Sequence, residues 1–435
     1  MAPLNILIVG CSIAGPTLAT FLLLSPSPAS AKPRITILER SSALRTQGQN
    51  VDIRGVGVTI IRKLGLETAI RASTTGEEGV QWVTKENRVW SSFRASGDER
   101  MHSPTSDIEI MRGRLADICW KRSKAVSNEV EREGGQGIEY VFGDHLDELD
   151  QDGMKVHVRF AESGERRTFD LVVGADGLQS QTRKMVWGAE GEEERVHRLD
   201  VYGAFFSIPQ GETDTMWRRC FHTEGRRVIM VRPSEESGRT TVFLHVANEK
   251  DKRFPEVATS GHDSVEAQKA LIKEYFQDAG WESERIIREM MATKDFYYEI
   301  VAQVKMDRWS KGRVVLLGDA AYCASPMSGM GTTLAMYGAY NLAGALSCYP
   351  DDPTLAFAEY EEKMRPSVDR AQKLMPGMFR IMNPETAWGV WIVDTIISLL
   401  VWSRLVKLLL MFKKPERSTV PVEEYGLGEL PEWRE

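Results

Sequence analysis

The chain has 435 residues, of which 42% are hydrophobic and 27% charged, and these values exclude a largely disordered protein. Its 55 basic and 62 acidic residues give a formal net charge of −7, which disfavours nucleic acid as the main partner. Five scattered cysteines without a CxxC pair, and seven histidines without paired-ligand spacing, argue against a disulfide framework and a metal centre, so we expect a cytoplasmic protein.

The first 40 residues predict a strand, a tight turn, a helix and a second strand, which span residues 4–9, 10–15, 16–24 and 34–38. The opening run of Ile, Leu and Val is typical of a parallel strand that is buried on both faces. This stretch imitates a secretory signal peptide, but it lacks a basic start and is interrupted by two glycines and Pro16. We therefore interpret it as a βαβ unit.

Farther along the chain, two kinds of sequence alternate. Segments with an α/β pattern occur at residues 1–75, 112–185 and 305–375. Alternating polar and apolar residues predict antiparallel strands at 76–111 and 190–304. Length alone suggests about three domain-sized units. The alternation instead predicts a mixed α/β (α+β) fold, in which an antiparallel-β lobe is inserted into a nucleotide-binding lobe and a helical tail follows at 376–435.

A glycine-rich turn, V-G-C-S-I-A-G-P, joins the first strand to the first helix. A dinucleotide fingerprint has the form GxGxxG at this place, because glycines allow a tight turn and close packing of helix against strand. Gly10 and Gly15 match this form, and Ser12 replaces the middle glycine. The helix N-terminus would hold a pyrophosphate, and Glu39 would accept hydrogen bonds from a ribose diol. An ordinary glycine turn is the alternative, but the whole arrangement favours dinucleotide binding.

Two later motifs also follow buried strands, at the strand ends where open α/β sheets bind ligands. The first runs from Asp176 and Gly177 to Arg183, after the strand DLVV. The second is Gly318-Asp319, which follows VVLL and precedes a glycine-rich loop that opens a helix. Asp319 can hold a ribityl or ribose hydroxyl, and amides at the helix N-terminus can face an electron-rich ring edge. Each motif alone could be an ordinary connection, but their order points to one cofactor site.

These three motifs, in this order and spacing, resemble those of class A FAD-dependent monooxygenases, the para-hydroxybenzoate-hydroxylase-like group. The chain is similar in particular to the branch with tetracycline-inactivating and aromatic-polyketide hydroxylases, and the resemblance extends to about residue 375. It implies a Rossmann-like FAD-binding lobe, an inserted substrate-binding β-sheet lobe and C-terminal helices. The departures are Ser12 in place of glycine and Tyr322 where relatives often have histidine.

The resemblance also implies which residues bind the cofactor. They come from the three motifs and from the segment around residue 50, and they are Gly10, Ser12, Gly15, Glu39, Arg40, Gly48, Asp52, Arg54, Arg112, Asp176, Arg183, Asp319, Pro326, Gly331 and Thr332. Glu39 would bind the adenosine ribose, and Arg112, in an Arg-x-x-Leu motif, would contact the ribityl–pyrophosphate region.

Other expected contacts lie closer to the flavin ring. Gly331 and Thr332 would lie beside the isoalloxazine, Pro326 near its face, and Asp52 in a flavin-proximal segment. Arg54 could meet the nicotinamide cofactor. Asp176 and Arg183 belong to a motif implicated in both FAD and NADPH binding.

The implied reaction is that of the cofactor. NADPH or NADH would reduce FAD, O₂ would form a C4a-hydroperoxyflavin, and one oxygen atom would pass to a small apolar, aromatic or polyketide-like secondary metabolite. Hydroxylation is the first choice. Epoxidation, Baeyer–Villiger insertion and a non-catalytic FAD- or ligand-binding protein are the alternatives. The protein must exclude water and aim the substrate.

A phenolic substrate would gain from a nearby base or cation. The candidates in the β-rich lobe are Tyr202, Arg218, His222 and His245. Each is more often a structural residue, because strands in any sheet carry such side chains.

The segment 388–412 has apolar residues at helical spacing, together with Asp394, Arg404 and Lys407. Because a transmembrane span needs about 20 residues without charges, we do not predict one. A helix folded back on the catalytic lobes is the slightly favoured interpretation. The alternative is an interfacial helix that brings the protein into peripheral contact with a membrane.

Overall fold

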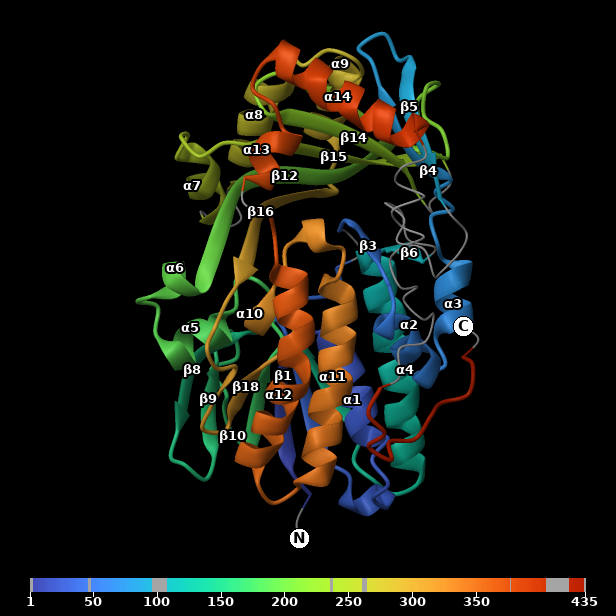
Figure 1. Ribbon diagram of the computed structural model, residues 1–435. Coiled ribbons are helices and arrows are strands. Elements are labelled where there is room, and N and C mark those ends of the chain that lie inside the picture. The colour runs from blue at the N-terminus through green and yellow to red at the C-terminus, as the bar shows by residue number, and fades with distance from the viewer. Residues whose placement is uncertain are drawn as a thin grey trace.

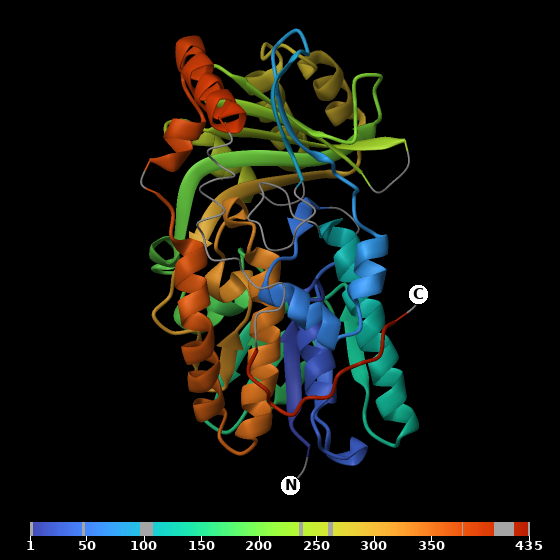
Figure 2. The ribbon, with the colours of Figure 1, turned by 45° about the vertical axis from the view of Figure 1, so that its right-hand side comes forward.

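A computed structural model describes residues 3–45, 48–95, 108–234, 238–259, 264–375, 377–403 and 422–433. The chain forms two lobes, which lie one above the other in Figure 1. The long strands β12 (Val196–Pro209) and β16 (Phe296–Val304) rise from the lower lobe into the sheet of the upper one (Figures 1 and 2). The predicted mixed α/β fold class is confirmed.

The lower lobe is built on a six-stranded sheet with five parallel strands. Its order is β17 (Ser310–Lys311), β18 (Val314–Leu316), β11 (Leu171–Gly174), β1 (Asn5–Val9), β2 (Arg34–Glu39) and β7 (Ile138–Phe142), and β17 is antiparallel. The opening strand pairs with β2 on one side and with β11 on the other. The first predicted βαβ unit is therefore the centre of this sheet.

Both faces of this sheet are covered, which explains why its strands read as continuous apolar runs. Helices pack on one face: α1 (Ala14–Leu23), α2 (Val56–Lys63), α3 (Glu67–Ala72), α4 (Arg112–Arg132), α10 (Asp319–Tyr322), α11 (Gly331–Cys348) and α12 (Pro353–Gln372). The other face contacts α5 (Gln181–Trp187) and a small sheet of β8 (Leu146–Gln151), β9 (Val156–Phe160) and β10 (Arg166–Phe169). Gly65, at φ +64°, separates α2 from α3.

The upper lobe is a seven-stranded, mainly antiparallel sheet. Its order is β16, β12, β15 (Arg239–Ala247), β14 (Arg227–Pro233), β13 (Arg218–Thr223), β4 (Gly79–Val83) and β5 (Val89–Arg94). One face packs on α7 (Arg253–Thr259), α8 (Ser264–Phe276) and α9 (Ser283–Ala292) in an apolar core. A two-stranded ribbon of β3 (Asn50–Asp52) and β6 (Glu109–Met111) lies between this sheet and the lower lobe.

The other face of the upper sheet turns toward the lower lobe, and register places its side chains in rows across the strands. A polar row contains Arg232, Thr241 and Ser207. The next row is mainly apolar and contains Cys220, Met230, Phe243, Phe205 and Tyr297. A third row is mixed and contains His222, Val228, His245, Gly203 and Glu299. We call these the polar, apolar and mixed rows.

The C-terminal residues contribute to both lobes. The short helix α13 (Met378–Met382) and the helix α14 (Ala387–Trp402) pack against the upper sheet. The favoured interpretation of a folded-back helix thus fits the part of segment 388–412 that the structure describes, whereas Arg404 and Lys407 lie outside the described residues. Among the described helices, none is both long and apolar enough to span a bilayer.

Residues 422–433 return to the lower lobe and run beside α2 and α4 (Figure 1). Lys63 forms ion pairs with Glu424 and Glu429, and Arg122 donates a hydrogen bond of 2.7 Å to the carbonyl of Pro431. The amide of Trp433 donates to the carbonyl of Gly65 at 2.8 Å. We call residues 422–433 the C-terminal clasp.

Candidate active site

The glycine turn has the geometry that its sequence predicts. Gly10 has φ +113°, and a Cβ atom there would lie 2.4 Å from the carbonyl oxygen of Ala175. A Cβ at Gly15 would lie 2.1 Å from the carbonyl oxygen of Gly10. Both positions therefore require glycine, and α1 begins directly behind the turn. Ser12 is half-buried in the same turn.

Glu39 ends β2 beside this turn. Its carboxylate accepts hydrogen bonds from the backbone amides of Cys11 at 3.0 Å and Ser41 at 2.9 Å. A carboxylate has about four acceptor sites, so Glu39 can hold the turn and still accept from a ribose diol. The neighbouring Arg40 is exposed.

The segment 48–54 meets the glycine-rich loop before α11. The backbone amide of Arg54 donates to Thr333 Oγ1 at 3.1 Å, and the Arg54 guanidinium forms an ion pair of 2.8 Å with Asp52. A Cβ at Gly329 would lie 3.3 Å from Asp52 Oδ2. These contacts bring Asp52 and Arg54 beside the loop that contains Pro326, Gly331 and Thr332, although the two segments are far apart in sequence.

Arg112 and Asp319 lie together between the lobes. Arg112 begins α4, and its backbone amide donates to the carbonyl of Gln49 at 3.0 Å, next to Gly48. Burial disfavours the charge of Arg112, but Tyr297, Asp319 and Glu299 outweigh this effect and raise its pKa. Burial raises the pKa of Asp319, and Arg112 partly opposes the shift. The Gly318-Asp319 motif and the upper sheet therefore meet at this arginine.

The motif around Asp176 and Arg183 joins a half-buried aspartate to a buried arginine. Asp176 accepts from Ser180 Oγ at 2.5 Å and from the Thr182 amide at 2.9 Å, so it holds the start of α5. The fully buried Arg183 pairs with Glu192 and donates to the carbonyl of Ala320 at 2.7 Å. Because Ala320 follows Asp319, this arginine fixes the backbone beside the predicted cofactor ligand. Its guanidinium is engaged by the protein itself.

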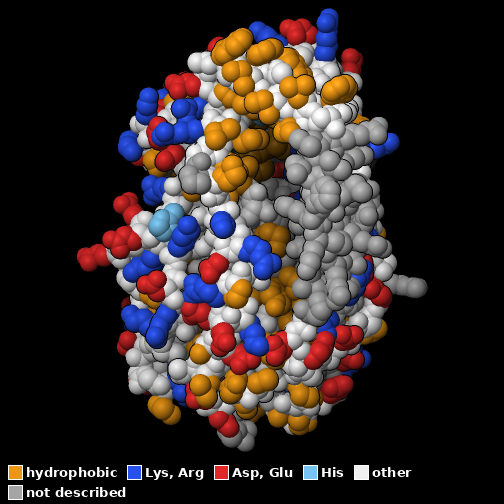
Figure 3. Space-filling model, viewed as in Figure 1, with side chains coloured by type: hydrophobic (Ala, Val, Ile, Leu, Met, Phe, Trp, Pro, Cys, Tyr) orange, Lys and Arg blue, Asp and Glu red, His pale blue; other side chains and the backbone are white. Residues whose placement is uncertain are grey.

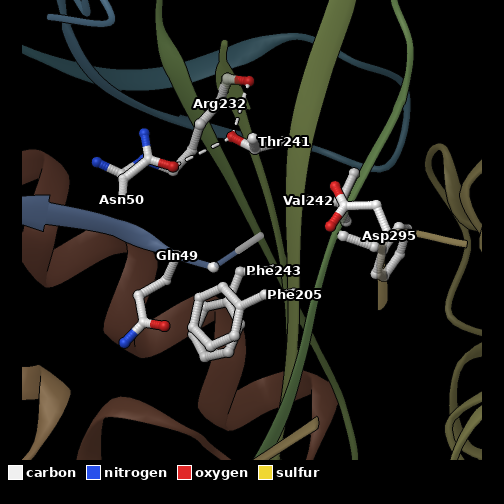
Figure 4. A pocket seen from close by; sticks show the side chains of 10 residues that line it. Gln49, Asn50, Phe205, Arg232, Thr241, Val242, Phe243 and Asp295 are labelled. Carbon is white, nitrogen blue, oxygen red and sulfur yellow. Dashed lines mark hydrogen bonds between the residues drawn. The ribbon is translucent and has the colours of Figure 1, made fainter. Parts of the chain in front are cut away.

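A small cavity lies between the upper sheet and the segment that begins at Gly48. Figure 4 shows the rings of Phe205 and Phe243 stacked beside it; their centroids are 4.0 Å apart and their planes differ by 6°. Asn50, Arg232 and Thr241 lie on another side of the cavity, and the Thr241 hydroxyl donates to Asn50 Oδ1 at 3.4 Å (Figure 4). The cavity thus has a flat aromatic wall and a polar edge.

Arg218, expected as a candidate for catalysis, belongs to a buried group of four charges. It pairs with Glu77 and Glu109, each at 2.8 Å, and Arg232 pairs with the same two carboxylates. The Glu77 and Glu109 side chains are 2% and 3% exposed. Arg232 and Arg218 hold the pKa of Glu109 below its usual range, against the effect of burial. The group joins the upper sheet to β6.

The other three catalytic candidates lie away from the cavity. Tyr202 faces the helices α7–α9, where its ring stacks on Phe254, because its position in β12 has the opposite parity to Phe205. His222 contacts Asp394 of α14, with 2.6 Å between Nδ1 and Oδ1. His245 Nε2 lies 2.8 Å from Asn383 Oδ1, and burial lowers the pKa of His245 to about 4. The expectation for Tyr202 is therefore corrected, and both histidines join C-terminal residues to the sheet.

Tyr297 and Glu299, which sequence reasoning missed, face Arg112 and Asp319 from β16. The signal was present, since Glu299 interrupts the apolar run in FYYEIVAQV. In the described part of the chain, Gln49 Oε1, Glu299 Oε2 and Ser325 Oγ are buried without a hydrogen-bond partner. Such orphaned oxygens near Arg112 and the glycine-rich loop fit a site for a large polar cofactor.

Comparisons with known proteins agree with this site. Residues 4–372 match the FAD binding domain family. The chain is 33% identical over 430 residues to the FAD-dependent monooxygenase asL6 of Sarocladium schorii, covering 97% of this chain and 98% of the relative. It is 32% identical to the monooxygenase CTB7 of Cercospora beticola, covering 90% and 92% of the two chains.

Solved structures show the same architecture. The tetracycline destructase Tet(51) superposes with a TM-score of 0.73 at 26% identity, covering 97% of this chain and all of the other. Klebsiella pneumoniae HpxO, complexed with FAD and uric acid, shares the fold with a TM-score of 0.65 at 17% identity, covering 94% and 96% of the chains. The chain therefore belongs to the FAD-binding-domain family of class A flavin-dependent monooxygenases.

Proposed function

We propose that the protein consumes NAD(P)H and O₂ to insert one oxygen atom into a flat aromatic or polyketide-like molecule. The observation that carries this proposal is the stacked Phe205–Phe243 wall of the cavity, which lies beside the Gly48–Asn50 segment and near Arg112 and Asp319. Parallel aromatic side chains favour a flat ring system stacked against them. Hydroxylation is the proposed outcome, and epoxidation or Baeyer–Villiger insertion would use the same arrangement.

The protein's own part in the reaction is to bind and aim the substrate. The apolar row offers a flat surface, and Asn50, Thr241 and Arg232 form a polar edge beside it that suits an oxygen-bearing rim of the substrate. We propose that Glu39 holds the adenosine ribose, and that Arg112, Asp319, Pro326, Gly331 and Thr332 surround the rest of FAD. Bound FAD, once reduced, supplies the activation of O₂. Fixing the substrate beside the flavin replaces a bimolecular encounter with a prearranged one.

The names of the similar proteins support this substrate class. Tet(51) is a tetracycline destructase, and HpxO has been crystallised with uric acid. Both ligands contain fused, oxygen-bearing rings. A cavity with an aromatic wall and a polar edge fits a molecule of that kind.

The test is NADPH oxidation and product analysis under ¹⁸O₂. A substrate should stimulate NADPH consumption and gain one ¹⁸O atom. Phe205→Leu should raise KM about tenfold by removing ring stacking, equivalent to ~1.4 kcal/mol. Phe221→Leu is the matched control, because Phe221 packs in the apolar core of the upper lobe and does not line the cavity. Turnover without oxygen incorporation, or equal effects of the two variants, would contradict the proposal.

A separate observation supports a second proposal, that α14 contacts a membrane surface. Trp388, Trp391, Ile396, Leu399 and Trp402 recur on the outward side of this helix and are 47–83% exposed. Its one charged residue, Asp394, points inward to His222. Figure 3 shows apolar side chains gathered at the top of the molecule, over α13 and α14.

The sequence behind α14 suits an anionic lipid surface. Residues 404–417 include five basic residues and one acidic residue. An apolar face with tryptophans, followed by basic residues, is typical of an interfacial helix. Basic residues near a membrane contribute about 1 kcal/mol each to binding of anionic lipid.

Flotation with phosphatidylcholine vesicles, with and without phosphatidylserine, tests this proposal. The full chain should float with the anionic vesicles, and replacement of Trp388, Trp391 and Trp402 by serine should abolish flotation. A control replaces the exposed Val89, Met154 and Met216 in the same way. Truncation before α14 is unsuitable, because it also removes the C-terminal clasp. A wild-type protein that stays at the bottom of the gradient would overturn the proposal.

A further inference from the structure

Glu299 is a buried carboxyl group without a structural partner for one of its oxygens. It lies in the mixed row, on the face of β16 that turns toward the lower lobe, and its register partner in β12 is Gly203. Because Gly203 has no side chain, the Phe243 ring occupies the space there, 2.3 Å from where a Cβ would lie. Glu299 Oε2 is buried and accepts no hydrogen bond. This oxygen is therefore available to carry a proton.

The charges that face Glu299 come from three elements. Arg112 approaches from the start of α4, Asp319 from the start of α10, and Tyr297 from the same strand. Arg45 acts on Tyr297. His245 shares the row but lies two strands away and bonds to Asn383. Arg112 is thus the cation that both carboxyl groups, Glu299 and Asp319, have in common.

FAD changes this balance when it binds. Its two phosphate groups would bring negative charge, and its bulk would exclude water from the surroundings of Arg112. Both effects favour the neutral form of a neighbouring carboxyl group. An anionic ligand would also share the positive charge of Arg112 with Glu299 and Asp319, and so weaken its effect on either carboxyl group.

We propose that FAD binding is coupled to the uptake of a proton by Glu299. The apoprotein exchanges a proton at this carboxyl group, and the FAD complex holds the carboxyl group neutral. By thermodynamic linkage, the affinity for FAD falls as the pH rises past the titration of Glu299 in the apoprotein. This inference rests on FAD binding and not on the proposed oxygenation, so the two can fail separately.

The electrostatics place this coupling near neutral pH. Burial raises the pKa of Glu299 to about 7, although Arg112 acts in the opposite direction. Below that pH, Glu299 is already protonated before FAD arrives, and the affinity does not depend on pH. Above that pH, the dissociation constant for FAD rises by up to about tenfold per pH unit, until the pH at which Glu299 loses its proton in the FAD complex.

The test is calorimetric titration of FAD into full-length protein stripped of flavin. In buffers with different ionisation enthalpies at about pH 8, wild-type protein should take up close to one proton per FAD, and almost none at about pH 6. The dissociation constant should rise about tenfold over this interval. Absence of proton uptake at both pH values would overturn the proposal, and this measurement needs no variant.

Variants assign the proton to its residue. Glu299→Gln keeps the shape and remains neutral, so it should bind FAD equally well across this pH range, with no proton uptake. Glu284→Gln, at an exposed position on α9, is the control and should behave as the wild type. Unchanged proton uptake in Glu299→Gln would assign the proton to Asp319 or another group and refute the inference. If that variant does not fold, Glu299→Met provides the same comparison.

Discussion

Substitution of Arg218 distinguishes clearly between a structural and a catalytic role for this residue. Its side chain is 14% exposed and pairs with two carboxylates that are 2% and 3% exposed. Arg218→Met would leave Glu77 and Glu109 with Arg232 alone, in a site where burial already raises the pKa of Glu77. Removing one partner of a buried ion pair costs about 3–5 kcal/mol, because the remaining charge stays buried. We expect the free energy of unfolding to fall by about this amount.

Thermal unfolding followed by near-UV circular dichroism measures the loss, and a fall of the unfolding temperature by about 3–5 °C is expected for a chain of 435 residues. The double variant Arg218→Met, Glu77→Gln should recover part of the stability, because it removes one charge of each sign. Arg253→Met, in an exposed ion pair with Asp251 and Glu274, is the control and should change the unfolding temperature little. If Arg218→Met instead keeps the wild-type stability but abolishes turnover, the structural assignment is wrong.

Three further predictions concern the lower lobe and the mixed row. Gly15→Ala should lower the free energy of unfolding by about 1–3 kcal/mol and reduce the amount of bound flavin, because the new Cβ would lie 2.1 Å from a backbone oxygen. A variant that purifies with a normal flavin spectrum would contradict this prediction. Asp319→Ala should purify with little FAD, measured as flavin absorbance per protein, and unchanged flavin content refutes its assignment. Burial lowers the pKa of His245 from 6.5 to about 4, so the folded state resists its protonation. We expect the free energy of unfolding of the wild-type protein, relative to that of His245→Gln, to fall by up to about 3 kcal/mol between pH ~6.5 and pH ~4. Urea unfolding at each pH measures this difference.

Sequence reasoning succeeded where the geometry is local. Gly10, Gly15 and Glu39 lie within one βαβ unit, and the strand–turn–helix spacing dictates their positions. These positions depend on short stretches of chain, so the sequence carries enough information to locate them.

The cavity could not be located in this way, because it depends on strand register between distant segments. Phe205 and Phe206 are adjacent in sequence, yet the Phe205 ring stacks on Phe243 and the Phe206 ring belongs to the core on the opposite face of the sheet. A shift of one residue would exchange them. The alternation of side chains along each strand likewise directs Tyr202 to the core and Glu299 to the opposite face, toward Arg112. The pairing of β12 with β16 joins segments about 100 residues apart, and no local pattern specifies that alignment.

The C-terminal clasp has a consequence for the order in which the protein is made. The upper sheet is complete once the ribosome has synthesised β16, which ends at Val304. The lower lobe begins with the first strand but still lacks the backbone partners of Lys63, Gly65 and Arg122 until residues 422–433 emerge. Because domains fold as their segments become available during synthesis, the inserted lobe can form first. The FAD-binding lobe is then completed only once residues 422–433 have emerged and made their contacts with Lys63, Gly65 and Arg122.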